Sequence, residues 1–195
     1  MKQVWKGGTL LYPLPAVLVS CGTNEASNLI TVAWTGIVCT NPPMLYISVR
    51  PERYSHGLIS ANMQFTVNLT TASMARATDL CGVRSGRDSD KWELSGLTPY
   101  PGVAVECPAV AESPLSLECR VRSITHLGSH DMFIAEITGA LADDMYMDAD
   151  TGKFSLEKAG LMSYSHGGYY TQGELLGTFG FSVKKKKKHK NIVHG

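Results

Sequence analysis

Alternation between apolar and polar residues constrains the fold of this chain more than any other feature of its sequence. In residues 44–50, Leu45, Ile47 and Val49 are separated by side chains that would point to the opposite face. A period of two residues is that of a β-strand, in which successive side chains leave opposite faces of the sheet. The segments that carry strand character are 14–20, 28–35, 44–50, 65–69, 115–121 and 131–141.

Proline-rich and glycine-rich turns separate these segments, at 41–43, 99–102 and 107–108. Helices are expected to be few and short. The predicted helical segments are a turn capped by Ser55 that runs to Ala61, a helix over 72–80 between Thr71 and Gly82, and a helix over 90–95 between Ser89 and Gly96. The pattern predicts an all-β protein with a few short helices, whose antiparallel strands form a closed or nearly closed barrel in a single domain.

Composition agrees with a packed domain and argues against a nucleic-acid role. The 195 residues are 44% hydrophobic, which is ample for one core. The formal net charge is only +1, and six of the 18 Lys and Arg residues lie in 184–190, so the remainder is mildly acidic. We therefore expect a domain over 1–183 and a basic, disordered tail over 184–195. The alternative for the tail is a salt-sensitive attraction to polyanions or membrane surfaces.

Cysteine usage and hydropathy predict a cytoplasmic protein. Five cysteines, without any C-x-x-C pair, argue against a disulfide framework and a zinc knuckle. No secretory h-region follows Met1, and no run approaches the 18 apolar residues that would suggest a membrane span. His126 and His130 are four residues apart, but at a strand end and a turn rather than on a helix, so we expect no metal site.

An anion site is predicted where the strand over 44–50 ends. Ser48 and Arg50 share a face of their strand, Arg53 follows at once, and Ser55 opens a helical turn. A guanidinium group gives forked hydrogen bonds to phosphate oxygens, hydroxyl groups add neutral donors, and a helix N-terminus attracts anions. The alternative is that both arginines are ordinary surface charges and that Ser55 is only a cap.

Several motifs, in order, resemble the flavin reductase-like family and, within it, the flavoredoxins. The first motifs are Asn28-x-x-Thr-x-Ala-Trp34, the run Pro-Pro-x-Leu-x-Ile-Ser-Val-Arg-Pro that ends at Pro51, and Arg53-x-Ser55. The likeness continues through 65–68, 90–92, 95–98, Gly128-Ser-His130 and the aromatic stretch 164–170, and it covers about residues 10–182.

The resemblance implies a split β-barrel that binds FMN, usually as a homodimer with the flavin near the subunit interface. It assigns the phosphate to Ser48, Arg50, Arg53 and Ser55, and the isoalloxazine and ribityl groups to the strand with Asn28, Thr31, Ala33, Trp34 and Thr35. Alternation points the side chain of Trp34 toward the core, so its backbone is the expected contact.

Two further residues are placed near the flavin by the same resemblance. Asn68 is expected to reach the ribityl group or the phosphate, and Lys91 to approach the flavin as a donor near N1 and O2. Independently of the resemblance, Cys81 is a candidate cofactor contact because Cys81-Gly82 closes the helix predicted over 72–80; the alternative is a buried structural thiol.

His130 is the predicted catalytic residue, because it matches the family's Gly-Asp-His motif, in which the histidine lies near the nicotinamide or the flavin face. Here the middle residue is Ser129 and the acid follows as Asp131. The aromatic residues Tyr164, His166, Tyr169 and Tyr170 either complete a cleft or dimer contact, or simply pack.

The function implied is an FMN-binding oxidoreductase, an NAD(P)H-dependent flavin or ferric reductase. It would move electrons from NAD(P)H or a protein donor through FMN to flavin, ferric iron or a redox partner protein. No G-x-G-x-x-G follows a strand, so a nicotinamide would stack directly on the flavin. The alternatives are a non-catalytic electron carrier and a flavin storage or sensor protein.

Overall fold

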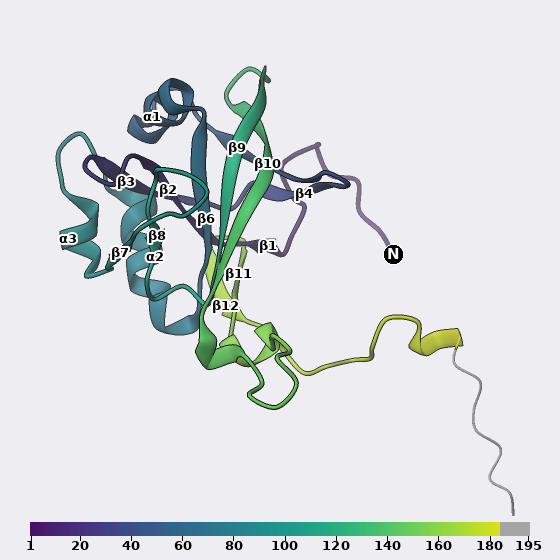
Figure 1. Cartoon of the computed structure of the whole chain (residues 1–195). Helices are drawn as coiled ribbons and strands as arrows, with labels where there is room; N and C mark the ends of the chain where they lie inside the picture. Colours follow the sequence, from purple (N-terminus) through teal and green to yellow (C-terminus); the bar gives the residue numbers. More distant parts are fainter. Residues whose placement is uncertain (184–195) are drawn as a thin grey trace, which may run out of the picture.

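The structure is a computed structural model that describes residues 1–183; the predicted basic tail lies outside the described residues. Strands dominate it, as predicted (Figure 1). The strands are β1 (Leu14–Pro15), β2 (Val17–Gly22), β3 (Ser27–Val32), β4 (Thr35–Thr40), β5 (Pro43–Val49), β6 (Gln64–Leu69), β7 (Pro99–Tyr100), β8 (Ala109–Val110), β9 (Leu115–His126), β10 (Asp131–Ala142), β11 (Met162–Ser165) and β12 (Gly168–Thr171).

Three α-helices and four 3₁₀ turns complete the described part of the chain. The α-helices are α1 (Tyr54–Asn62), α2 (Ala75–Val83) and α3 (Lys91–Ser95). The 3₁₀ turns are η1 (Ala72–Met74), η2 (Asp144–Tyr146), η3 (Leu156–Ala159) and η4 (Phe181–Val183). Within residues 1–183, none of these helices combines the length and the apolar character needed to cross a membrane.

Seven strands form one antiparallel sheet in the order β3-β2-β6-β9-β10-β5-β4. The two outermost strands, β3 and β4, are consecutive in sequence and are joined only by Ala33 and Trp34. The backbone N–H of Ser48 on β5 donates to the carbonyl of Trp34 over 2.9 Å, so the connection is held beside β5. The sheet thus curls until its two edges meet at this short connection, which is where the barrel is split.

The interior of the barrel is filled by the apolar faces that alternation predicted. Leu45, Ile47 and Val49 of β5 are at most 2% exposed and pack with residues of β2, β3, β6, β9 and β10 in one core cluster. Ile59 of α1 closes one end of this cluster and is fully buried. Burial of such side chains is the main stabilising contribution to the fold, at about 1.5–3 kcal/mol for each large residue.

A second, smaller core lies outside the barrel. Leu18 of β2 and Leu29 of β3 are fully buried there against Met74, Ala77 and Cys81 of the η1–α2 region. Because β2 has one face in the barrel and the other under α2, all six of its residues are buried. The helix α2 is thereby fixed directly behind β3, with its C-terminal end close to α1 and α3 (Figure 1).

The predicted helix boundaries needed correction. Thr71 precedes a 3₁₀ turn and makes no capping bond, and Gly82 lies inside α2 rather than after it. The cap of α3 is Asp90, not Ser89, since the Asp90 carboxylate accepts from the N–H groups of Trp92 and Glu93. The predicted end of α3 is confirmed, because Gly96 follows with φ 69°.

The predicted aromatic stretch forms a small sheet and packs on other parts of the chain. Strands β11 and β12 pair with each other, and β11 pairs with β1. The ring of Tyr164 lies 5.5 Å from that of Tyr169, and Tyr12 stacks against His166 at 4.5 Å. The hydroxyl of Tyr169 donates to Asp79 of α2 over 3.2 Å. This cluster ties the small sheet to α2.

Candidate functional site

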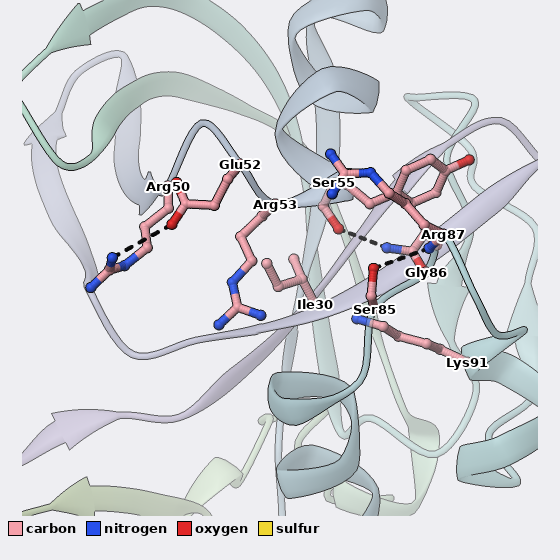
Figure 2. A pocket seen from close by; sticks show the side chains of 11 residues that line it. Ile30, Arg50, Glu52, Arg53, Ser55, Ser85, Gly86, Arg87 and Lys91 are labelled. Carbon is pink, nitrogen blue, oxygen red and sulfur yellow. Dashed lines mark hydrogen bonds and ion pairs between the residues drawn. The ribbon is translucent and has the colours of Figure 1, made fainter.

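A polar hollow of about 360 Å³ lies where β3, the first turn of α1 and the loop 84–90 meet (Figure 2). It is lined by Asn28, Ile30, Arg50, Glu52, Arg53, Tyr54, Ser55, Ser85, Gly86, Arg87 and Lys91. Five of these residues were predicted from the sequence to bind the cofactor, which are Asn28, Arg50, Arg53, Ser55 and Lys91. The free N–H groups of the first turn of a helix attract anions, and α1 begins at this hollow.

Ser55 is held inside the hollow by Asn28. The side-chain amide of Asn28 donates to the hydroxyl of Ser55 over 2.7 Å, and both residues are buried. The prediction that Ser55 caps this helix was wrong: Ser55 lies in the first turn of α1, and the cap residue is Arg53, without a side-chain capping bond. The Ser55 oxygen accepts from Asn28, so its single proton is left to be donated, and the thiol of Cys21 is one acceptor within its reach.

Lys91 brings a buried positive charge to the wall of the hollow. Its Nζ donates to the carbonyl of Leu29 over 2.8 Å and to that of Cys81 over 2.9 Å, and the residue is only 4% exposed. Burial lowers the pKa of Lys91, while the nearby thiol of Cys81 acts in the opposite direction. An ammonium group has three N–H donors, so one remains for an anion in the hollow.

Three arginines surround the opening of the hollow. Arg53 donates to the carbonyl of Gly82 at the end of α2 over 3.4 Å, and Arg50 pairs with Glu52 at 3.5 Å (Figure 2). The third, Arg87, was not predicted from the sequence. It lies on an irregular loop, where no periodic pattern indicates which way a side chain points.

A second hollow of about 170 Å³, called the flat hollow below because it is more open than the first, continues from the polar hollow. It is lined by Ile30, Thr31, Val32, Ala33, Trp34, Ser48, Val49, Arg50, Arg53 and His130, so Ile30, Arg50 and Arg53 belong to both hollows. Ser48 lies here and not in the polar hollow, which differs from its predicted place at the phosphate. The hydroxyl of Thr31 is used within the protein, since it donates to the carbonyl of Thr78.

Trp34 and His130 form one wall of the second hollow. Their ring centroids are 4.4 Å apart, with an interplanar angle of 37°. The sequence placed the Trp34 side chain toward the core, but it is 36% exposed. The reason is that β3 ends at Val32 and β4 begins at Thr35, so the alternation is broken at this point. Burial, and then the charge of Arg50, lowers the pKa of His130.

Three predicted cofactor residues lie outside both hollows. Asn68 is fully buried and uses its amide within the protein, accepting from Ser116 over 2.7 Å and from the N–H of Val110 over 2.9 Å. The thiol of Cys81 is buried in the second core, and burial raises its pKa. Thr35 donates to the carbonyl of Tyr46 over 2.6 Å and thus holds β4 to β5.

Comparison with known proteins agrees with this geometry. The family described as Flavin reductase like domain matches residues 9–171, most of the chain. The chain belongs to the flavin reductase-like family. An uncharacterised protein of Archaeoglobus fulgidus is 30% identical over 161 residues, which are 83% of this chain and 89% of the relative.

Solved structures of flavoredoxins have the same fold as this member of the flavin reductase-like family. The flavoredoxin of Desulfovibrio vulgaris (Miyazaki F) is 31% identical, with a TM-score of 0.84 over 94% of this chain and 100% of that chain. The flavoredoxin of Methanosarcina acetivorans is 28% identical, with the same TM-score and coverage. The predicted family and the antiparallel split-barrel fold are confirmed, and membership supports flavin binding and a flavin-related oxidoreductase function.

Proposed function

We propose that the chain binds FMN across the two hollows and serves as an NAD(P)H-dependent flavin or ferric reductase. The observation that carries this proposal is the continuity of the two hollows through Ile30, Arg50 and Arg53. One hollow is polar and cationic, and the other is flat and flanked by aromatic rings. FMN has the same division, with a phosphate ester at one end and a planar ring system at the other.

The polar hollow has the donors that a phosphate dianion requires. Ser55 offers a hydroxyl proton, Lys91 offers its third N–H, and Arg53 and Arg87 bring guanidinium groups to the opening. Charge-assisted hydrogen bonds of this kind are stronger than neutral ones. Their number at one end of the site favours the monophosphate over riboflavin, which lacks the anion.

The flat hollow suits the isoalloxazine ring. The consecutive residues 30–34 line it, and the packed rings of Trp34 and His130 form part of its wall. The bound flavin would supply the redox chemistry, which is hydride acceptance followed by electron donation. The protein contributes placement and electrostatics: Lys91 provides positive charge beside the site, and His130 is in position to orient a nicotinamide at the exposed edge of the hollow.

The second candidate function is that of an electron carrier of the flavoredoxin kind. It is favoured by the 31% and 28% identity to two flavoredoxins. Such a carrier would take its electrons from a protein donor and would react slowly with nicotinamides.

We further propose that two copies of the chain associate near the site. Ile37 and Val38 on the edge strand β4 are 68% and 52% exposed, directly after Trp34. Leu176 and Phe179 of the C-terminal segment are almost fully exposed as well. Exposed apolar residues on an unpaired strand edge favour association. Light scattering of the purified protein, alone and with Ile37→Lys, tests this arrangement.

Absorption spectroscopy and anaerobic reduction test the proposed function. We expect purified protein to be yellow, or to quench FMN fluorescence with a stoichiometry of one, and to bind riboflavin more weakly. NADPH or NADH under anaerobic conditions should then bleach the flavin rapidly. Slow bleaching by both nicotinamides with fast reduction by a ferredoxin would favour the carrier function. Protein that neither retains FMN nor quenches its fluorescence would refute both.

A further inference from the structure

A buried carboxylate holds two histidines at the end of the barrel nearest to the candidate site. Asp131, the first residue of β10, is 4% exposed. Its Oδ1 lies 2.8 Å from Nδ1 of His126, at the end of β9, and its Oδ2 lies 2.8 Å from Nε2 of His56 in α1. Hydrogen bonding by His126, and then by His56, lowers the pKa of Asp131, so the carboxylate is ionised at neutral pH.

Each of these bonds fixes a segment that carries a residue of the site. The pair His126–Asp131 closes the base of the turn 127–130, which is also closed by the N–H of Leu127 donating to the carbonyl of His130 over 2.9 Å. The pair His56–Asp131 joins this turn to α1, where His56 directly follows Ser55. The carboxylate therefore links the turn that carries His130 to the helix that forms the polar hollow.

Asp131 itself faces away from the flat hollow. Neighbouring side chains of an extended chain point to opposite faces. Accordingly, His130 packs against Trp34 and lines the hollow, whereas Asp131 is turned toward α1 and does not line it. Any effect of Asp131 on the site must act through the position of the turn.

We propose that Asp131 is a positioning residue, which holds the imidazole of His130 against the indole of Trp34 by clasping His56 and His126. The part of this inference that concerns flavin reduction rests on the proposed function. The geometric part does not, because the contact between His130 and Trp34 exists within the protein itself and can be measured without flavin.

Indole fluorescence in the flavin-free protein gives the direct test. A protonated imidazole quenches an adjacent indole more than a neutral one does, so Trp34 emission should change as His130 titrates, at a pH below the usual pKa of histidine. The signals of Trp5 and Trp92 are removed by subtracting the spectrum of a Trp34→Phe variant. His130→Ala should abolish the titration in the difference spectrum.

Two variants then cut the clasp. Asp131→Asn keeps the size of the side chain but can no longer accept from both histidines, and His126→Gln removes the partner that is most exposed, with 82% of its side chain accessible. We expect both to lose at least half of the Trp34 titration amplitude. Asp148→Asn is the matched control, because Asp148 also closes a turn, through Thr151, without lining either hollow.

Circular dichroism establishes which variants fold. If Asp131→Asn does not fold, His126→Gln decides the question alone. A full Trp34 titration in either folded clasp variant would overturn the proposal. With FMN bound, Asp131→Asn should also slow reduction by NADPH roughly tenfold, since small misplacements of site residues are costly to rate. If wild-type protein gives the titration, the clasp variants lose it, and the protein binds no FMN, the proposed function fails while the positioning role of Asp131 stands.

Discussion

The ammonium group of Lys91 is held by two backbone carbonyls, those of Leu29 at 2.8 Å and Cys81 at 2.9 Å, and thereby connects β3 to the end of α2. Both contacts come from residues whose side chains are fully buried in the second core. The lysine is therefore fixed by the same packing that places α2 behind β3. The direction of the third N–H of Lys91 is therefore fixed by the packing of β3 and α2, although the lysine side chain is flexible in itself.

The first prediction concerns the pH dependence of FMN affinity. Burial lowers the pKa of Lys91 in the folded protein. At a pH between the pKa of Lys91 in the folded state and its pKa in the unfolded state, the unfolded chain therefore binds more protons. In that window Lys91 makes the free energy of unfolding rise with pH. A phosphate beside it favours the charged form. FMN affinity should therefore fall in the alkaline range, at a pH below the usual pKa of lysine. Fluorescence titration of FMN across pH measures this effect.

The control for this prediction is Lys91→Met, which keeps the length of the side chain without its charge. Its FMN affinity should be lower at neutral pH and should not show the alkaline decrease. Lys158→Met, on an exposed 3₁₀ turn, should behave as the wild type. An alkaline decrease that persists unchanged in Lys91→Met would assign the titration to another group.

The second prediction distinguishes FMN from riboflavin. Arg53 belongs to both hollows but is exposed, so the loss of its charge-assisted bond in Arg53→Ala should cost about 1.5 kcal/mol, at the lower end for such bonds. FMN should bind about tenfold more weakly, while riboflavin binding changes little. The matched control is Arg76→Ala, because Arg76 is an exposed arginine on α2 that lines neither hollow. Equal weakening of both ligands would count against a phosphate contact.

The third prediction concerns Gly86, at the point where the loop 84–90 touches β3 and α1. A Cβ added here would lie 2.2 Å from Oδ1 of Asn28 and 2.8 Å from Cδ1 of Tyr54. Gly86→Ala should therefore push Asn28 away from Ser55 and misplace the hydroxyl that would bind the phosphate of FMN. The loss of this one charge-assisted bond, between Ser55 and the phosphate, should weaken FMN binding by about tenfold. Isothermal titration calorimetry measures the loss.

Gly57→Ala gives the control for that steric argument. Gly57 is in α1, two residues after Ser55, but nothing lies within 4 Å of a Cβ added there. This variant should keep wild-type affinity and gain up to about 1 kcal/mol in stability, from the higher helix propensity of alanine. If Gly86→Ala binds FMN normally, the loop must yield where Asn28 was expected to move.

The barrel strands that could be predicted are those buried on at least one face. In β5, the strict alternation of Leu45, Ile47 and Val49 determines which face enters the core, and the structure confirms it. The alternation failed at Trp34, where the chain leaves one edge of the sheet and joins the other. A periodic pattern carries no information across such a break.

The candidate site was predictable only where it coincides with regular elements. Ser55 and Arg53 were found because they follow a recognisable strand and start a helix. Arg87 and Gly86 were missed because their loop is brought to α1 by tertiary contacts alone. Asn68 was predicted to reach the cofactor but lies inside the protein. The face of β6 that looked polar in the sequence is covered by β8 and the start of β9. Sequence alternation identifies a face but not what covers it.

The fourth prediction concerns stability without function. Glu118 of β9 is 1% exposed, and its Oε1 accepts from the N–H groups of Val103 at 2.7 Å, Ala104 at 2.9 Å and Val105 at 3.3 Å. Glu118→Ala leaves these donors without their acceptor and should lower the free energy of unfolding by about 2–4 kcal/mol. Urea denaturation measures the change. Neither hollow contains Glu118, so FMN affinity should stay within about twofold of the wild type once the protein is folded.

The exposed pair Arg122–Glu136 provides the comparison for Glu118. Glu136→Ala breaks this ion pair, which should cost less than about 1 kcal/mol because surface pairs contribute little. Similar losses of stability in Glu118→Ala and Glu136→Ala would show that the buried carboxylate does not anchor the loop 101–107.

The fifth prediction addresses the role of His130. Burial and the charge of Arg50 lower its pKa, so the imidazole that packs on Trp34 is neutral at pH 7. His130→Ala should retain FMN, because the polar hollow is intact, but should be reduced by NADPH at least tenfold more slowly, since the nicotinamide loses its orienting partner. Anaerobic stopped-flow absorbance gives the rate, and the absorption ratio of flavin to protein gives the FMN content.

The pH profile separates an orienting role from simple packing. In the wild type, the charge of Arg50 repels a protonated His130. Protonation should therefore shift the imidazole from its position, and the reduction rate should fall on the acid side, below the usual pKa of histidine. His130→Ala should lack this acid limb. His166→Ala, which removes a ring packed on Tyr12, should keep both the rate and the acid limb. Reduction of His130→Ala at the wild-type rate would exclude His130 from hydride transfer.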